Sequence, residues 1–151
     1  MMKIRKRRSN EVLPIDLLLL ADPSEEMIDT YRDRSEWFIA DKVGEIIGVY
    51  GLLETRPETV ELINLAVRES EHGKGYGKQL VKDAVKYAQA SGYKTIEVGT
   101  GNSSINQLSL YQKCGFRIIG VDQDFFTKNY EEEIKENGIL CKDMIRLARE
   151  L

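Results

Sequence analysis

The stretch Glu61–Gly92, ELINLAVRESEHGKGYGKQLVKDAVKYAQASG, contains the strongest indication of how this chain folds. Its apolar start is typical of a buried strand, and a loop containing Gly73, Gly75 and Gly77 follows. Glycine lets a backbone come close to a bulky group. The first amides of the helix after the loop have no intrahelical partner and are partly positive. Together these features predict a binding site for phosphate or pyrophosphate.

The helix after the loop is amphipathic. It is predicted to run from Gly75 to about Ser91 and to end at Gly92, because glycine readily adopts the left-handed conformation that follows a helix. One face carries the apolar side chains that we expect in the core, namely Leu80, Val81, Ala84, Val85 and Ala88. We therefore expect this helix to pack against a sheet.

The sequence up to Val67 predicts a short opening strand, two short helices and then three antiparallel strands. A leucine-rich run at residues 13–20 has helical spacing and ends at Asp22-Pro23, and Ser24 is suited to cap a second helix. Runs of β-branched and aromatic residues, separated by turns, predict the strands. The predicted strands are an opening one at residues 3–7 and then 37–40, 46–53 and 60–67.

Shorter elements follow the amphipathic helix. Ser104 and Gln107 predict a capping box for a helix that ends at Gly115. An acidic segment covers residues 122–138, and strands are predicted at residues 95–98, 116–121 and 139–147. The order of elements predicts one domain, residues 1–151, of mixed α/β (α+β) class: a mixed sheet with helices on both faces.

Composition excludes several classes of protein. Of the 151 residues 42% are hydrophobic and 31% charged, and the net charge is −3, so we expect no nucleic-acid partner. The run Leu17–Ala21 is far shorter than the ~20 residues that span a bilayer, so we expect no membrane partner. One histidine and two cysteines without a Cys-x-x-Cys motif predict no metal site and a reduced, cytoplasmic protein.

Two familiar interpretations of a glycine-rich loop fail on spacing. A nucleoside-triphosphatase loop has the pattern G-x-x-x-x-G-K-[S/T], but Gly73–Gly77 is one residue short and Gln79 follows Lys78. A dinucleotide fingerprint has the pattern G-x-G-x-x-G in the first unit of a parallel sheet, whereas this loop comes after three antiparallel strands. Another phosphate carrier is therefore expected.

Three motifs occur in a defined order: the strand ELINLAV (61–67), the loop HGKGYG (72–77) and the helix end LYQKCGF (110–116). With these motifs the chain resembles the GNAT superfamily of acyl-CoA-dependent N-acyltransferases, as found in bacterial N-acetyltransferases. In the family's loop, Q/R-x-x-G-x-G/A, Gly75 and Gly77 occupy the small positions, and His72 replaces the usual Gln or Arg. The resemblance spans nearly the whole chain. It implies a six- to seven-stranded, mostly antiparallel sheet with splayed central strands and about four helices.

The resemblance also implies that acetyl-CoA is the co-substrate and enters between the strand ending at Val67 and the strand at residues 95–98. The loop amides would hold the pyrophosphate. The main chain at residues 65–67 would bind the pantetheine arm and polarise the thioester carbonyl. Ser104 is explained equally well as a plain helix N-cap. The implied cofactor-binding set is Leu65, Ala66, Val67, His72, Gly73, Lys74, Gly75, Tyr76, Gly77, Lys78, Asn102 and Ser104.

The implied reaction is direct transfer of the acetyl group to a primary amine within a ternary complex. Glu61 matches the position that serves as general base in several family members, and its alternative is an exposed strand residue. Glu54 and a water chain are further candidates for the base. Tyr111 matches a tyrosine that protonates the departing CoA thiolate, and its alternative is a core-packing residue.

The acceptor side is less defined. The segment 122–138 is acidic and aromatic, which favours a cationic acceptor amine, small molecule or peptide, unless its charges simply face solvent. Dimers are common in the family, so the resemblance leaves a homodimer open. A second interpretation of the whole chain is a degenerate GNAT fold that binds acyl-CoA as a sensor or scaffold without turnover, and His72 is the residue that favours it.

Overall fold

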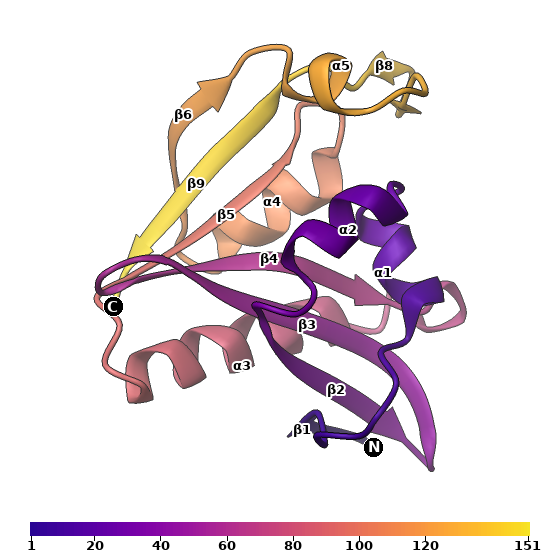
Figure 1. Cartoon of the computed structure of the whole chain (residues 1–151), viewed down its shortest axis with the longest axis vertical. Coiled ribbons are helices and arrows are strands. Elements are labelled where there is room, and N and C mark those ends of the chain that lie inside the picture. The colour runs from indigo at the N-terminus through magenta and orange to yellow at the C-terminus, as the bar shows by residue number, and fades with distance from the viewer.

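The computed structural model describes all 151 residues and contains one seven-stranded sheet of order β1-β2-β3-β4-β5-β9-β6 (Figure 1). All neighbours in it are antiparallel except β4 and β5. The predicted mixed, mostly antiparallel sheet is therefore confirmed. Its strands are β1 (Met2–Lys6), β2 (Glu36–Lys42), β3 (Glu45–Arg56), β4 (Thr59–Val67), β5 (Thr95–Gly101), β6 (Arg117–Asp122) and β9 (Met144–Glu150).

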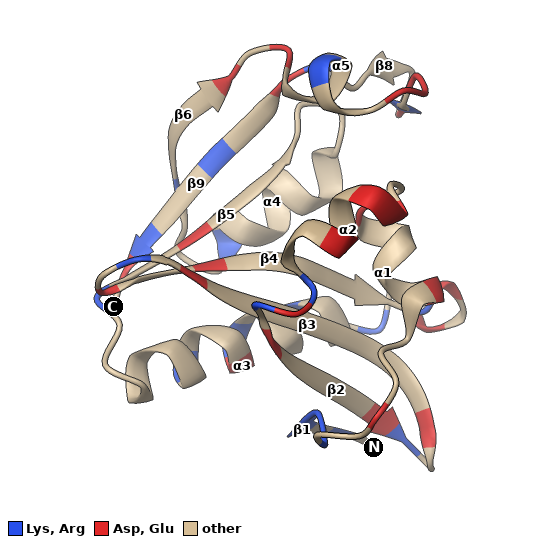
Figure 2. Ribbon diagram, viewed as in Figure 1, with Lys and Arg blue, Asp and Glu red and all other residues tan.

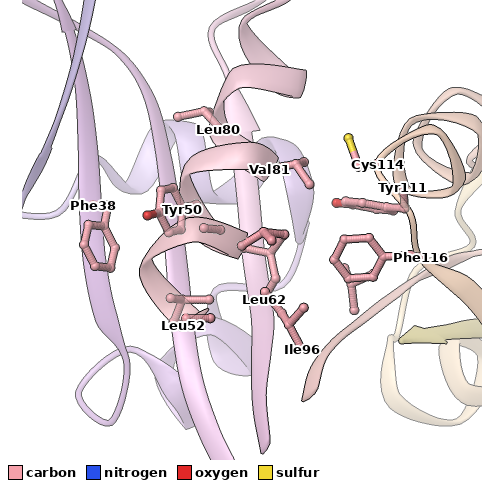
Figure 3. Packing of buried hydrophobic residues seen from close by; sticks show 14 of the residues in the cluster. Phe38, Tyr50, Leu52, Leu62, Leu80, Val81, Ile96, Tyr111, Cys114 and Phe116 are labelled. Carbon is pink, nitrogen blue, oxygen red and sulfur yellow. The ribbon is translucent and has the colours of Figure 1, made fainter. Parts of the chain in front are cut away.

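Five α-helices accompany the sheet and create two cores, one on each face. Figure 3 shows the larger core, in which Leu80 and Val81 of α3 pack beside Leu62 and Ile96 of the sheet. The smaller core lies between the sheet and the pair α1 and α2, around Leu17. Helices on both faces were predicted and are confirmed. They are α1 (Ile15–Ala21), α2 (Glu25–Tyr31), α3 (Tyr76–Ala90), α4 (Ile105–Lys113) and α5 (Phe125–Asn129).

A bulge in β4 changes which side chains face each core. Leu62 pairs with Leu52 of β3 and Asn64 pairs with Gly51, so Ile63 is the extra residue. Leu62 belongs to the core under α3, whereas Asn64 and Ile63 contact the side of α1 and α2. A bulge bends a strand and redirects its side chains. Here the bulge turns the Asn64 side chain toward α1 and α2, directly after the last residue of β4 that pairs with β5.

The parallel strands β4 and β5 separate after a short ladder. They pair only from Thr59↔Thr95 to Leu62↔Val98, although β4 continues to Val67 and β5 to Gly101. Figure 1 shows the two strands diverging as a V, with α4 on the β5 side and α1 on the β4 side. The expected splay of central strands is present, and it opens the sheet in its middle.

One prediction for the C-terminal part was wrong. The last predicted strand, 139–147, is broken into β8 (Ile139–Leu140) and β9, because the Asn102 amide oxygen accepts hydrogen bonds from the amides of Lys142 and Asp143 and holds a bend between them. The acidic segment 122–138 also contains structure that was not predicted. It forms α5 and the strand β7 (Lys135–Glu136), which pairs with β8.

The predicted capping box at Ser104 is wrong as well. Ser104 is the N-cap residue of α4, but its side chain forms no capping hydrogen bond. Its hydroxyl donates instead to Glu136, at 2.9 Å, because the β7–β8 hairpin places a carboxylate beside the helix start. A charged acceptor makes a stronger hydrogen bond than a neutral one. By contrast, Ser24 caps α2 as predicted, by accepting from the amide of Met27.

Candidate active site

A cavity of about 640 Å³ occupies the gap between β4 and β5. Its walls come from β4, the glycine loop, β5 and α4, with α1 and the segment after β6 closing one end. Many of the residues predicted for cofactor binding line it: Leu65, Ala66, Val67, His72, Gly73, Gly75, Tyr76, Gly77 and Ser104. Tyr111 lines it too. Segments that lie far apart in sequence thus meet around one cavity.

The glycine loop presents a row of unused amides to this cavity. No backbone N–H from Gly73 to Lys78 donates a hydrogen bond within the chain, and the first bond of α3 comes from Gln79 to the carbonyl of Gly75. Such amides at a helix start bind anions through both hydrogen bonds and the helix dipole. The loop therefore offers main-chain donors that are suited to an anion, and we refer to it below as the anion cradle.

Glycine is required at two positions of this cradle. Gly73 and Gly75 have φ values of +79° and +82°, which disfavour any residue with a Cβ. A Cβ on either residue would meet no atom within 4 Å, so the space above the loop is open. Glycine at these two positions therefore permits the positive φ and leaves the loop backbone accessible to a ligand.

His72 supports the loop through its ring. Its Nε2 lies 2.7 Å from the carbonyl oxygen of Val67, and since a carbonyl only accepts, Nε2 carries the proton and donates. This bond ties the start of the loop to the end of β4. The histidine therefore has a structural role at the position where the family's loop usually has Gln or Arg.

Three predicted cofactor residues do not line the cavity. Lys74 lies 2.6 Å from Glu71 in an ion pair, and Lys78 is exposed on the first turn of α3. Asn102 uses both ends of its amide within the protein, since its nitrogen donates to the carbonyl of Leu140 and its oxygen holds the bend before β9. Any contact of these three residues with a ligand stays a prediction.

Tyr111 combines burial with a free hydroxyl. Its ring packs edge-on against Phe116, with centroids 5.8 Å apart, and the side chain is buried in the core under α3. Its phenol forms no hydrogen bond within the chain and points toward Val81 in Figure 3. Burial raises the pKa of the phenol above its usual value of 10. The neutral, proton-carrying form is thus strongly favoured at this wall of the cavity.

Glu61 lies on β4, one residue before the cavity wall begins, and is buried (9% exposed). Burial raises the pKa of its carboxyl, and the Arg146 guanidinium, 3.6 Å away, opposes that rise. Its direct neighbour on β5 is Glu97, which is 6% exposed and which the sequence analysis did not single out. Glu54, the alternative base, accepts a hydrogen bond from Tyr93 and does not line the cavity.

A partly buried polar network closes the end of the cavity near α1. The Asn64 side chain donates to the hydroxyl of Tyr31, which donates to Asp22, and Asp22 also accepts from Tyr130 at 2.7 Å. Asn64 is only 4% exposed, and its amide oxygen has no hydrogen-bond partner. Sequence reasoning missed these residues as a group, although an Asn inside an apolar strand was a visible signal.

Acidic residues surround this end of the cavity. Asp22 and Glu136 line it, and Figure 2 shows further acidic positions on α2 and between α5 and β8. No group of three or more His, Cys, Asp or Glu side chains is placed to hold a metal ion. No helix has the length and apolar character needed to cross a membrane. The acidic residues at the α1 end of the cavity favour a cationic ligand there, whereas the anion cradle lies at the opposite end.

Known proteins share this architecture. A family model described as "Acetyltransferase (GNAT) family" matches residues 9–116. "Uncharacterized N-acetyltransferase YvbK" from Bacillus subtilis (strain 168) is 60% identical over 136 residues, which cover 90% of this chain and 88% of that protein. The solved structure of an IAA acetyltransferase from Bacillus cereus ATCC 14579 is 56% identical, with a TM-score of 0.96 over 100% of both chains.

A further solved structure includes a ligand. It is a GNAT family acetyltransferase from Elizabethkingia anophelis with acetyl-CoA bound, 48% identical, with a TM-score of 0.97 over 99% of this chain and 98% of that chain. At these identities and TM-scores the likeness extends to sequence as well as to fold.

Proposed function

Because this chain belongs to the GNAT family of acetyltransferases, we propose that it transfers the acetyl group of acetyl-CoA directly to a primary amine while both substrates are bound. The observation that carries the proposal is the meeting of an anion cradle, a widened sheet and a buried tyrosine hydroxyl around one cavity. The acetyl-CoA in the Elizabethkingia anophelis relative supports the same co-substrate here.

The loop is suited to the pyrophosphate of CoA. Six successive amides, from Gly73 to Lys78, have no partner within the chain and lie at the start of a 15-residue helix. Their number and polarity fit a group with several negative oxygens. In this proposal backbone amides hold the anion, and the Lys78 side chain adds positive charge nearby.

The freed edge of β4 is suited to the pantetheine arm and the thioester. The ladder to β5 ends at Leu62, so residues 64–67 are paired with β3 on one side and border the cavity on the other. Main-chain groups on such an edge can pair with an amide-containing ligand as with another strand. An N–H there, near Leu65 to Val67, would also stabilise negative charge that develops on the thioester oxygen.

The acceptor must lose a proton before its nitrogen can attack. An alkyl amine with a pKa of about 10.4 is almost fully protonated at pH 7, and its deprotonation costs between about 4 and 5 kcal/mol. Burial raises the pKa of Glu61 toward the range of an effective base, and its position beside the cavity allows transfer through a water molecule. We therefore assign Glu61 as general base.

Tyr111 is assigned as the general acid that protonates the departing thiolate. Its hydroxyl lacks any partner within the chain and its raised pKa keeps the proton in place until sulfur charge develops. A phenol is a weaker acid than a thiol with its pKa of about 8.5. Its contribution is thus a hydrogen bond that strengthens as the C–S bond breaks, followed by proton transfer.

The acceptor is proposed to be cationic before it reacts. Asp22 and Asn64 line the end of the cavity away from the glycine loop, and the carboxylate of the first and the unpartnered amide oxygen of the second can each accept a hydrogen bond. An ammonium group has three donors and no acceptor, which matches this pair. Polyamines, aminoglycosides and lysine-bearing peptides share that group and form the classes to test.

The test measures release of free CoA with a thiol reagent, in the presence of acetyl-CoA and a panel of these amines. Calorimetry of acetyl-CoA binding runs beside it. Binding together with amine-dependent CoA release and acetylated product supports the transferase. Tight acetyl-CoA binding without turnover on any amine would favour the sensor or scaffold instead, and absence of binding would contradict both.

A further inference from the structure

Strand β6, RIIGVD from Arg117 to Asp122, is an outer edge of the sheet with an apolar surface. It pairs with β9 on one side only, and Figure 1 shows no element beyond it. Ile118, Ile119 and Val121 are 53%, 57% and 51% exposed. An edge strand offers unpaired N–H and C=O groups, and exposed apolar side chains along it favour pairing with another chain.

The opposite edge of the sheet differs in kind. β1 carries Lys3, Arg5 and Lys6 within five residues, and charged side chains are the usual protection of an edge strand. Arg5 is also fixed by ion pairs to Glu11 and Asp41. Of the two edges, only β6 therefore combines free backbone groups with exposed apolar side chains.

We propose that β6 pairs antiparallel with β6 of a second copy of this chain, around a two-fold axis between Ile119 and Gly120. In that register Arg117 faces the partner's Asp122, Ile118 faces the partner's Val121, and Ile119 faces the partner's Gly120. Each pair occurs twice, because an isologous interface repeats every contact. The six-residue sequence is thus complementary to itself in charge and in size.

Details of β6 within one copy agree with this register. Neither Arg117 nor Asp122 forms an ion pair within the chain, so both charges are free for a partner. A Cβ on Gly120 would meet no atom within 4 Å, which leaves room for an opposing isoleucine.

The charges at the two ends provide a sharp test. Arg117→Asp places two carboxylates opposite each other at both ends of the interface, and Asp122→Arg places two guanidinium groups there instead. Each variant alone should weaken the dimer at least about tenfold, since attractive cross-strand pairs become repulsive. Mixing the two variants restores opposite charges across the interface, so a heterodimer should form. Lys3→Asp on β1 is the matched control and should leave the dimer unchanged.

The measurement is sedimentation of the full chain from about 1 μM to about 1 mM, because a short strand interface lies at the weak end of specific interfaces. Circular dichroism confirms that each variant is folded, and Ile118→Lys is a second variant that should also yield monomer. Wild-type dimer, two monomeric variants and a dimeric mixture support the proposal. A wild type that stays monomeric, or charge variants that dimerise as well as wild type, would overturn it.

Discussion

Glu61 and Glu97 are direct neighbours on the parallel strands β4 and β5, and both carboxylates are buried. Arg146 of β9 lies 3.6 Å from the first and 3.9 Å from the second, so one guanidinium serves both. The pair lies one residue before the last paired position of the two strands. The pKa of Glu61 is therefore set by its burial, by Glu97 of β5 and by Arg146 of β9.

Glu61→Gln should lower kcat at neutral pH and leave acetyl-CoA affinity unchanged, if Glu61 is the base. The deficit should shrink as the pH approaches the pKa of the acceptor, because the free amine then becomes abundant. The measurement is kcat from about pH 6 to about pH 10, with acetyl-CoA affinity by calorimetry. Glu54→Gln is the control on the neighbouring strand. Wild-type rates for the Glu61 variant at every pH would assign the proton to Glu97, Glu54 or solvent.

Arg146→Gln should shift the acidic limb of the pH profile of kcat/KM to higher pH. The Arg146 charge lowers the pKa of Glu61 against the effect of burial, so its loss raises that pKa further. A base must be deprotonated to work, and a higher pKa therefore moves the onset of activity upward. Lys82→Gln, on the exposed face of α3, should leave the profile in place. An unmoved limb in the Arg146 variant would show that this arginine does not act through Glu61.

Tyr111→Phe should reduce kcat by about 10²–10⁴, the usual cost of losing a general acid. The melting temperature should hardly change, because the ring keeps its contact with Phe116 and the lost hydroxyl has no partner in the chain. Tyr87→Phe is the control, since it removes a hydroxyl that binds Glu36 far from the cavity. Equal kcat for the Tyr111 variant and wild type would leave this residue with a packing role only.

Gly75→Ala should weaken CoA binding much more than it weakens the fold. Gly75 and Gly92 both have positive φ, +82° and +89°, and a Cβ on either would meet no atom within 4 Å. Alanine should therefore cost roughly 1–2 kcal/mol of backbone strain at each position. Only Gly75 lines the cavity. Calorimetry with CoA and thermal unfolding of both variants separate the effects. Equal CoA affinity in the two variants would contradict the proposed pyrophosphate site.

Glu11→Gln should lower the free energy of unfolding at pH 7, and the difference should vanish as the pH falls. Two hydrogen bonds from Arg5, both 2.7 Å, lower the pKa of the Glu11 carboxyl to about 2. In the unfolded chain the pKa of this carboxyl is about 4.3. The ionised carboxylate therefore stabilises the fold fully above that pH, and the stabilisation is lost as the pH falls toward the folded-state pKa of about 2. Because the pair is partly solvated, we expect about 1 kcal/mol or less, measured by urea unfolding at several pH values. A difference that does not depend on pH would contradict this origin.

Local sequence was sufficient for much of the fold. The five residues predicted for the buried face of α3, from Leu80 to Ala88, are all buried, and Gly92 follows the helix with positive φ. Ser24 caps α2 because a hydroxyl, three residues before the amide of Met27, needs nothing from the rest of the chain. Such features depend on contacts within one or two turns.

Contacts between distant segments account for the errors. The hydroxyl of Ser104 binds Glu136, 32 residues away, instead of capping its own helix. The bend before β9 depends on Asn102, which lies 40 residues before Lys142. A periodicity of apolar residues contains no information on such partners, so the strand at 139–147 looked continuous.

The same distinction applies to the site. Local sequence is sufficient for the free amides of the glycine loop, because the first amides of any α-helix have no intrahelical partner. The resemblance implied that β4 and β5 separate. The point of separation after Leu62, and the bulge at Ile63 that turns Asn64 toward Tyr31, emerged only in the folded chain. Strand pairing joins segments more than thirty residues apart, so the cavity exists only once the sheet has formed.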